Sequence, residues 1–226
     1  MSNKFIVCGM GGSALAAGLW RVAEPGLDLL IHRDYGLPRV PDYFLRESLI
    51  ILSSYSGNTA EVLDTAGKAL AENLNLAVIT SGGSSTPLGA NKLLDWAKEH
   101  NIPSSLLPAG YEPRLALEPA CEALGALLAQ DKPPARSDIA TSSKPDLAAD
   151  LVNKIPVVYS STRNLPLAYH WKISLNETAK MPSFCNALPE QNHNELESRF
   201  DERFSFIFLR DESDDSRINK RFEVLS

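Results

Sequence analysis

The chain has 226 residues, of which 44% are hydrophobic and 22% charged, and its formal net charge is -6. This length and apolar content allow a full core, in one large domain or two modest ones. Acidic and basic residues are mixed without long runs of one sign, so we expect no nucleic acid as partner. Because the sequence has no run of about 18 apolar residues and no signal-like start, we also expect no membrane partner.

Short apolar runs alternate with helical stretches along the first half of the chain. The predicted strands are Phe5–Cys8, Leu49–Ser53, Leu76–Thr80 and Ser104–Leu107, with Leu29–Ile31 as a further candidate. The predicted helices are Ala14–Val22, Ala60–Ala71, Leu88–His100 and Leu115–Ala129. Continuously apolar strands in such an alternation predict an α/β fold, in which helices cover both faces of a parallel sheet.

The second half repeats this pattern after a polar stretch that prolines interrupt. We interpret residues 130–146 as a linker between a first lobe, 1–129, and a second lobe, 147–226. In the second lobe we predict a strand at Val157–Ser160, a helix at Leu165–Ala179, a strand at Phe204–Leu209 and a helix from near Ser216. Two clear strands are few for a sheet, so the second lobe is predicted to be incomplete.

The three cysteines, Cys8, Cys121 and Cys185, are far apart and have no metal-like spacing. An odd number of distant cysteines is typical of reduced thiols that pack as small hydrophobic side chains. We therefore expect a cytoplasmic protein.

The first predicted strand leads into the glycine-rich segment Gly9-Met10-Gly11-Gly12-Ser13-Ala14. The segment satisfies the dinucleotide-binding pattern, and Asp34 lies about 20 residues on, where a ribose-binding acid is expected. The motif is weak alone, because any tight turn from strand to helix favours glycines, and Asp34 also fits a solvated strand end. A nicotinamide-dependent dehydrogenase is therefore one alternative.

A second loop, Ser54-Tyr55-Ser56-Gly57-Asn58-Thr59, joins an apolar strand to the next helix. The N–H groups and macrodipole of a helix start attract anions, and this loop adds three hydroxyls. An ordinary helix cap is the alternative, although a cap needs only one hydroxyl. Since parallel strands end at the same sheet edge, the loop can converge with Gly11-Gly12-Ser13, and small residues with hydroxyls favour a phosphate monoester over a pyrophosphate.

Five motifs follow one another along the chain: Gly9-Met10-Gly11-Gly12-Ser13-Ala14, Ser54-Tyr55-Ser56-Gly57-Asn58-Thr59, Glu112-Pro113-Arg114, Asn176-Glu177-Thr178-Ala179-Lys180 and Glu190-Gln191-Asn192-His193-Asn194-Glu195. In this order they resemble the motifs of the bifunctional phosphoglucose/phosphomannose isomerases, which are built from sugar isomerase domains. The resemblance covers almost the whole chain. It implies two three-layer α/β/α lobes with parallel sheets, and interconversion of glucose 6-phosphate and/or mannose 6-phosphate with fructose 6-phosphate through an enediolate. It implies neither a cofactor nor a required metal.

The resemblance also implies roles for individual residues. Glu177 would be the base that moves a proton between adjacent carbons, and Arg114 would stabilise the enediolate charge. His193 would assist ring opening, reaching the site from the partner subunit of a homodimer. The residues implied in substrate binding are Gly11, Gly12, Ser13, Ser54, Ser56 and Thr59.

Without the resemblance, several of these residues have simpler interpretations. Glu177 fits an exposed carboxylate at a helix end that pairs with Lys180, and Arg114 fits a surface arginine near a helix start. His193 and Glu195 could suggest a metal pair, but no third and fourth ligand has suitable spacing. We interpret Tyr55 as a packing residue.

The sequence departs from the family at both ends. Members carry a helical segment before the first glycine loop, whereas this chain reaches its first strand by Phe5. They also continue into a segment with a lysine that assists at the sugar ring, and Lys220 does not take that place. A phosphosugar-binding module without the complete catalytic apparatus is therefore the alternative to an isomerase.

Overall fold

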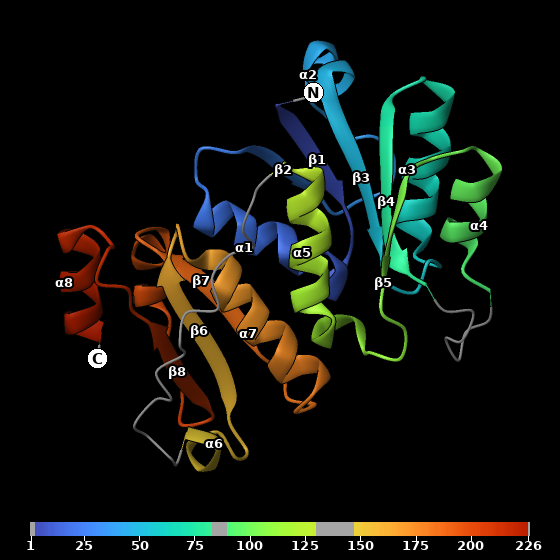
Figure 1. Ribbon diagram of the computed structural model, residues 1–226. Coiled ribbons are helices and arrows are strands. Elements are labelled where there is room, and N and C mark those ends of the chain that lie inside the picture. The colour runs from blue at the N-terminus through green and yellow to red at the C-terminus, as the bar shows by residue number, and fades with distance from the viewer. Residues whose placement is uncertain (1–2, 83–89, 130–146, 226) are drawn as a thin grey trace. The chain divides into compact units, whose positions relative to one another are not determined.

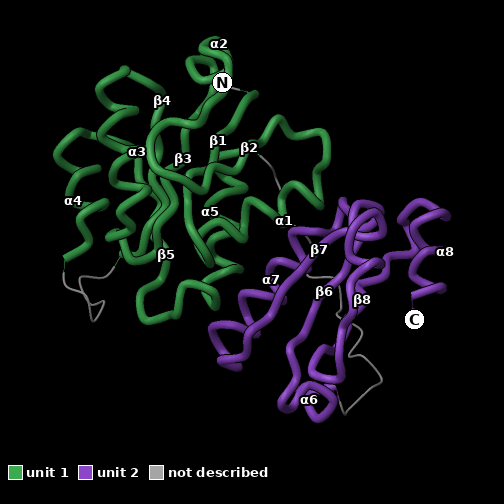
Figure 2. Tube along the Cα trace, turned by 180° about the vertical axis from the view of Figure 1, so that it is seen from behind, with its two compact units in different colours: residues 1–135 green, residues 136–226 purple. Residues whose placement is uncertain are grey.

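The computed structural model describes residues 3–82, 90–129 and 147–225. The chain divides into two compact units, Met1–Ala135 and Arg136–Ser226, which Figure 2 colours green and purple. The predicted linker, 130–146, lies outside the described residues, as does the start of the predicted helix Leu88–His100.

Unit 1 contains a parallel five-stranded sheet with the order β2-β1-β3-β4-β5 (Figure 1). Its strands are β1 (Lys4–Cys8), β2 (Asp28–His32), β3 (Ser48–Ser54), β4 (Asn75–Ser81) and β5 (Ser104–Leu107). All five predicted strands of the first half are present, including the candidate at Leu29–Ile31. This order places the topological switch point, where open α/β sheets bind ligands, between β1 and β3.

Helices cover both faces of this sheet, which explains why its central strands are largely apolar on both faces. One face carries Val7, Ile51 and Ile79 under α1 and α5, and the other carries Ile6, Ile50 and Val78 under α3 and α4. The helical elements are η1 (Gly11–Ala14), α1 (Leu15–Ala23), α2 (Asp42–Glu47), α3 (Ala60–Ala71), α4 (Lys92–Glu99), η2 (Pro113–Leu115) and α5 (Leu117–Leu127). The short α2 was not predicted, because its six residues bury none of their side chains.

Unit 2 contains a parallel three-stranded sheet with the order β7-β6-β8. Its elements are α6 (Leu147–Asp150), β6 (Ile155–Ser161), α7 (Leu165–Glu177), β7 (Phe184–Leu188), η3 (Glu190–His193), η4 (Glu195–Glu197), β8 (Phe204–Leu209) and α8 (Ser216–Leu225). Val158 and Ala168 belong to the core under α7, whereas Tyr159 and Phe222 belong to the core under α8. None of the described helices of the chain is long and apolar enough to cross a membrane.

The prediction of only two clear strands in the second lobe was wrong, because β7 adds a third. Its sequence, Phe184-Cys185-Asn186-Ala187-Leu188, is short and interrupted by an asparagine, and it lies at the sheet edge. Edge strands bury fewer side chains than central ones, so the apolar signal is weaker. Asn186 donates to the Glu195 carboxylate, a contact that the sequence did not predict.

The cysteines are free thiols, and Cys8 and Cys121 are buried. Burial raises the pKa of each of these two thiols to about 12. They therefore pack as neutral apolar side chains. The cytoplasmic location that their spacing suggested stays a prediction.

Candidate functional site

The carboxyl ends of β1 and β3 bring two of the sequence motifs together in unit 1. The glycine-rich segment follows β1, and the loop Ser54–Thr59 follows β3. The two strands are neighbours, paired in register from Lys4 with Ser48 to Cys8 with Leu52. Both motifs therefore lie at the switch point of the sheet, where the sequence predicted convergence.

The hydroxyls of the second loop are gathered around Ser54. The Ser54 and Thr59 hydroxyls share a hydrogen bond of 2.7 Å, and Ser56 Oγ lies 3.5 Å from Ser54 Oγ. Thr59 is the N-cap residue of α3, but its side chain makes no capping hydrogen bond to the helix. The cluster is thus not an ordinary cap, and its hydroxyls adjoin the first-turn N–H groups of α3 that attract anions.

Two buried contacts fix the path of this loop. Gly57 has a φ of +68°, and a Cβ atom there would lie 1.6 Å from Asn91 Oδ1. The Asn91 side chain caps α4 by accepting from Leu94 N, and it donates to Thr80 Oγ1 and Ser81 O. Asn91 therefore fills the space that glycine leaves open and joins the loop to the end of β4.

Ser13 connects the glycine-rich segment to the second loop. Its Oγ accepts a 3.0 Å hydrogen bond from Tyr55 N, and its backbone oxygen accepts one of 2.8 Å from Ser53 Oγ. These bonds hold η1 against the end of β3. They also show why a serine suits this position, since its side chain accepts from the neighbouring backbone.

The third motif, Glu112-Pro113-Arg114, packs on the glycine-rich segment. A Cβ atom on Gly12 would lie 2.8 Å from Arg114 N and 2.9 Å from the Pro113 carbonyl carbon, so only glycine allows this approach. The Arg114 side chain is only 16% exposed, and its Nη1 lies 3.3 Å from Glu112 Oε2. Arg114 is therefore not the surface arginine of the simpler interpretation, and the structure places its backbone against the glycine-rich segment.

Tyr55 joins the segment just before this third motif to the hydroxyl loop. Its ring is buried, and its hydroxyl donates to Pro108 O at 2.7 Å and accepts from Tyr111 N at 2.8 Å. The sequence predicted packing for Tyr55, and its hydroxyl in addition links two loops. No sequence pattern signalled that link, because both partners of the hydroxyl are backbone atoms.

Glu177 and His193 belong to unit 2, and they lie at opposite ends of its sheet. α7 runs from the carboxyl end of β6 back to the amino end of β7, because these two strands are parallel. Glu177 is the last residue of this helix of 13 residues, which is about 20 Å long. His193 follows the carboxyl end of β7, so these two predicted residues are not brought together within one chain.

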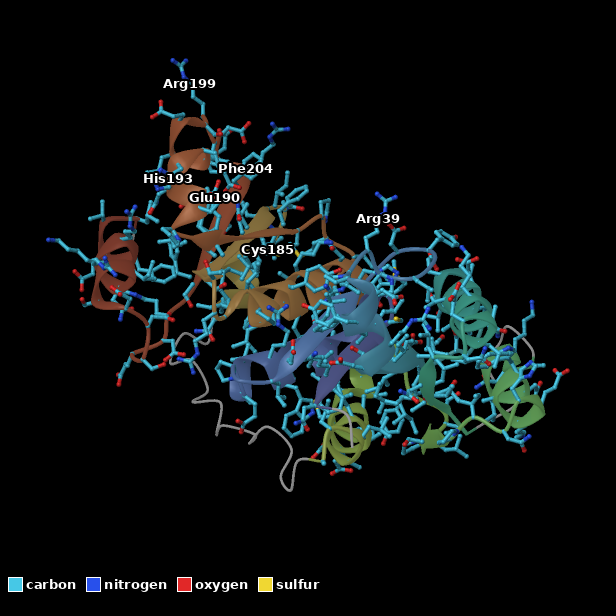
Figure 3. The ribbon with its side chains drawn as sticks, turned by 90° about the horizontal axis from the view of Figure 1, so that it is seen from above. Arg39, Cys185, Glu190, His193, Arg199 and Phe204 are labelled. Carbon is cyan, nitrogen blue, oxygen red and sulfur yellow. The ribbon has the colours of Figure 1, made fainter. Side chains whose placement is uncertain are left out.

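His193 lies on a turn in which a neighbouring residue, Glu195, is held by hydrogen bonds. Gln191 is buried, whereas His193 is exposed, and Figure 3 shows it on the same turn as Glu190. Glu195 accepts from Tyr159 Oη at 2.5 Å and from Asn186 Nδ2 at 2.6 Å, so both of its carboxylate oxygens are occupied. Glu195 is therefore a structural carboxylate, which does not support the metal pair with His193.

Two further features concern the alternatives of a nicotinamide-dependent dehydrogenase and of a metal site. Asp34 Oδ1 accepts from Tyr35 N at 2.7 Å, within its own turn, and the strand order is not the 3-2-1-4-5-6 of dinucleotide-binding domains. Among the described residues, no group of three or more histidine, cysteine or acidic side chains could hold a metal ion.

Comparison with known proteins identifies relatives and a matching family model. The model described as "Bacterial phospho-glucose isomerase C-terminal SIS domain" matches residues 141–226. A bifunctional phosphoglucose/phosphomannose isomerase from Thermoplasma volcanium is 30% identical over 98% of this chain and 72% of its own length. A protein of the same name from Aquifex aeolicus is 30% identical over 97% of this chain and 70% of its own length.

Solved structures share the fold at lower sequence identity. Tagatose-6-phosphate ketose/aldose isomerase from Escherichia coli superposes with a TM-score of 0.61 at 18% identity. The match covers 92% of this chain and 62% of that one. This similarity extends over both units and concerns the fold alone.

Proposed function

The chain belongs to the bifunctional phosphoglucose/phosphomannose isomerase family, and from this premise we propose that it interconverts glucose 6-phosphate and/or mannose 6-phosphate with fructose 6-phosphate. Unit 1 supplies the phosphate-binding residues, and unit 2 supplies the groups that move protons. The reaction needs no net oxidant, because a proton is removed from one of the carbons C1 and C2 and a proton is added to the other.

The observation that carries this proposal is the hydroxyl cluster at the start of α3. The hydroxyl oxygens of Ser54 and Thr59 lie 2.7 Å apart, at a helix start whose N-cap residue, Thr59, makes no side-chain capping bond. A phosphate monoester there accepts hydrogen bonds from hydroxyls and backbone N–H groups, and the helix dipole favours its charge. Gly11, Gly12 and Ser13 bring a second turn to the same edge, and Ser56 adds a third hydroxyl.

The proton chemistry needs a base, a group that stabilises the enediolate, and help with ring opening. We assign these roles to Glu177, Arg114 and His193 respectively. Arg114 suits its role because its side chain is only 16% exposed. A positive charge that is largely removed from water stabilises negative charge on a bound substrate more strongly than an exposed charge does.

We further propose a homodimer whose active sites are shared between subunits. Glu177 and His193 lie at opposite ends of the sheet of unit 2, separated by the length of α7. One centre that uses both residues would draw them from two different chains. A closed dimer with twofold symmetry satisfies this requirement for both centres at once.

The activity is tested by incubating the protein with fructose 6-phosphate in D₂O and following the sugars by NMR. We expect glucose 6-phosphate, mannose 6-phosphate or both to appear, with deuterium at C2, because an enediolate exchanges its proton with solvent. NADH added in a parallel titration should not bind. Binding of fructose 6-phosphate without any conversion would instead favour the phosphosugar-binding module.

The shared site is tested by mixing two inactive variants. Glu177→Ala and His193→Ala homodimers should each keep only a small residual activity, whereas subunit exchange between them should restore up to about a quarter of the wild-type activity, since half of the dimers are mixed and each has one intact centre. Exchange is followed independently with two affinity tags. Mixed dimers that form without activity contradict the shared site, and recovery at a 1:1 ratio supports it.

A further inference from the structure

A buried tyrosine hydroxyl lies beneath the turn that carries His193. Tyr159, on the central strand β6, is only 2% exposed, and its ring stacks on that of Phe206 with centroids 5.7 Å apart. Its Oη donates a 2.5 Å hydrogen bond to Glu195 Oε2. A buried hydroxyl on a fixed ring is a rigid anchor, because the ring leaves the bond little freedom to move.

The other oxygen of the same carboxylate is held from the neighbouring strand. Asn186 on β7 is paired directly with Tyr159 in the sheet, and its Nδ2 donates a 2.6 Å hydrogen bond to Glu195 Oε1. Two adjacent strand positions thus bind one carboxylate with both of its oxygens. This contact also explains the polar residue in the middle of β7.

A second residue of the turn is held by burial. Gln191 is only 2% exposed. Burial, followed by the bond to Glu195, raises the pKa of Tyr159 above its ordinary value, so the hydroxyl stays protonated and remains a donor.

Gln191 and Glu195 lie two residues before and two residues after His193. The turn is therefore held before the histidine by the burial of Gln191 and after it by the bonds to Glu195, while the imidazole itself is exposed. We propose that Tyr159 is a positioning residue, which holds Glu195 so that His193 is presented in a single orientation. The proposal deepens the function above and rests on its assignment of His193.

The test is a double-mutant cycle in the full chain with Tyr159→Phe and His193→Ala. Phenylalanine keeps the ring and removes only the hydroxyl. If Tyr159 acts through His193, Tyr159→Phe lowers kcat about 10- to 100-fold with KM nearly unchanged, since a misplacement of about 1 Å has effects of this size. In the His193→Ala background the same substitution should change the residual kcat less than about twofold. An equal fall in both backgrounds means that the tyrosine is merely structural and overturns the proposal.

Tyr43→Phe is the matched control, since this tyrosine lies in unit 1 and is 61% exposed. It should leave kcat unchanged. Glu195→Gln is the second variant, should Tyr159→Phe fold poorly: it keeps the shape but replaces one acceptor oxygen by an N–H group. It should show the same fall in kcat and the same dependence on His193, and a fall that persists without His193 counts against the proposal.

An NMR measurement separates failure of this proposal from failure of the isomerase assignment. The His193 ring signal is identified as the one missing from a His193→Gln spectrum. In Tyr159→Phe that signal should shift or broaden, while the signals of His32, His100 and His170 stay in place. This result is expected whether or not the wild type isomerises sugars. An unchanged His193 signal overturns the positioning role even if the enzyme is active.

Discussion

The two sheets of this protein present functional loops at their carboxyl edges, but they hold those loops differently. In unit 1 glycines allow close backbone packing, as where Gly12 leaves room for Pro113 and Arg114, and polar side chains such as Asn91 add further contacts. In unit 2 the turn with His193 is fixed by side chains, through Tyr159, Asn186 and Glu195. The first arrangement therefore needs glycines in addition to polar contacts, whereas the second depends on a buried polar network.

This difference fits the tasks proposed for the two units. Backbone packing leaves N–H groups and small hydroxyls at the surface of a turn, which suits a phosphate that carries several acceptor oxygens. A side-chain network instead supports one exposed imidazole. Glu177 lies on neither carboxyl edge, because it ends α7 at the amino end of the second sheet. The comparison therefore predicts that substitutions in the hydroxyl loop of unit 1 weaken binding, whereas substitutions of Glu177 and His193 in unit 2 slow the reaction.

The largest expected effect is that of Glu177→Gln. Glutamine keeps the size of the side chain but cannot take a proton from carbon, so kcat should fall by at least about 10²- to 10⁴-fold with little change in substrate affinity. Deuterium exchange at C2, followed by NMR, should vanish with it. Glu99→Gln is the matched control, because Glu99 also ends a helix, α4 in unit 1. Exchange near the wild-type rate in Glu177→Gln would remove Glu177 from its role.

Ser54→Ala and Thr59→Ala should weaken binding instead. A hydrogen bond to a charged group contributes about 1.5–3 kcal/mol, so each variant should bind fructose 6-phosphate about 10- to 150-fold more weakly. Calorimetry measures the dissociation constant, and kcat at saturation should change much less. Ser104→Ala removes a hydroxyl that donates to Ile102 O at the start of β5 and serves as control. Unchanged affinity in both loop variants would contradict the phosphate assignment and the division between the units.

The backbone packing of unit 1 is tested by comparing two glycines with positive φ. Gly57 (φ +68°) meets Asn91, whereas Gly110 (φ +91°) has no atom within 4 Å of an added Cβ. Gly110→Ala should lose about 1–2 kcal/mol through backbone strain alone. Gly57→Ala should lose about 1–3 kcal/mol more, because Asn91 must move. Thermal unfolding measures both, and equal losses would mean that the contact with Asn91 does not fix the loop.

The sequence predicted unit 1 better than unit 2 for a physical reason. Strands such as Leu49–Ser53 are buried on both faces and carry a strong apolar signal, so their positions were predicted to within a residue or two. β7 carries Asn186 at its centre and was missed, because its stability depends on a carboxylate nine residues later in the chain. Contacts of this kind have no local signature.

The candidate site shows the same limit. The hydroxyl loop could be predicted from Ser54 to Thr59 because strand, loop and helix follow one another directly. The link from Tyr55 to Pro108 and Tyr111, and the space that Gly12 leaves for Arg114, connect segments about 50 and 100 residues apart. The sequence suggested residues for the chemistry, but it could not predict the contacts that hold these loops in place.

The smallest expected effect is a pH dependence of the stability of unit 2. Partial burial in α7 lowers the pKa of His170, whereas the unfolded chain has the ordinary value near 6.5. As the pH falls through 6.5, the unfolded state therefore binds more protons than the folded state, and the free energy of unfolding decreases. His170→Gln has no such proton to bind. When the pH is lowered from 8 to 5.5, the unfolding temperature of the variant should therefore fall less than that of the wild type. Calorimetry of both proteins at the two pH values measures this difference. The same difference between the two proteins at both pH values would mean that His170 does not make the stability of unit 2 depend on pH.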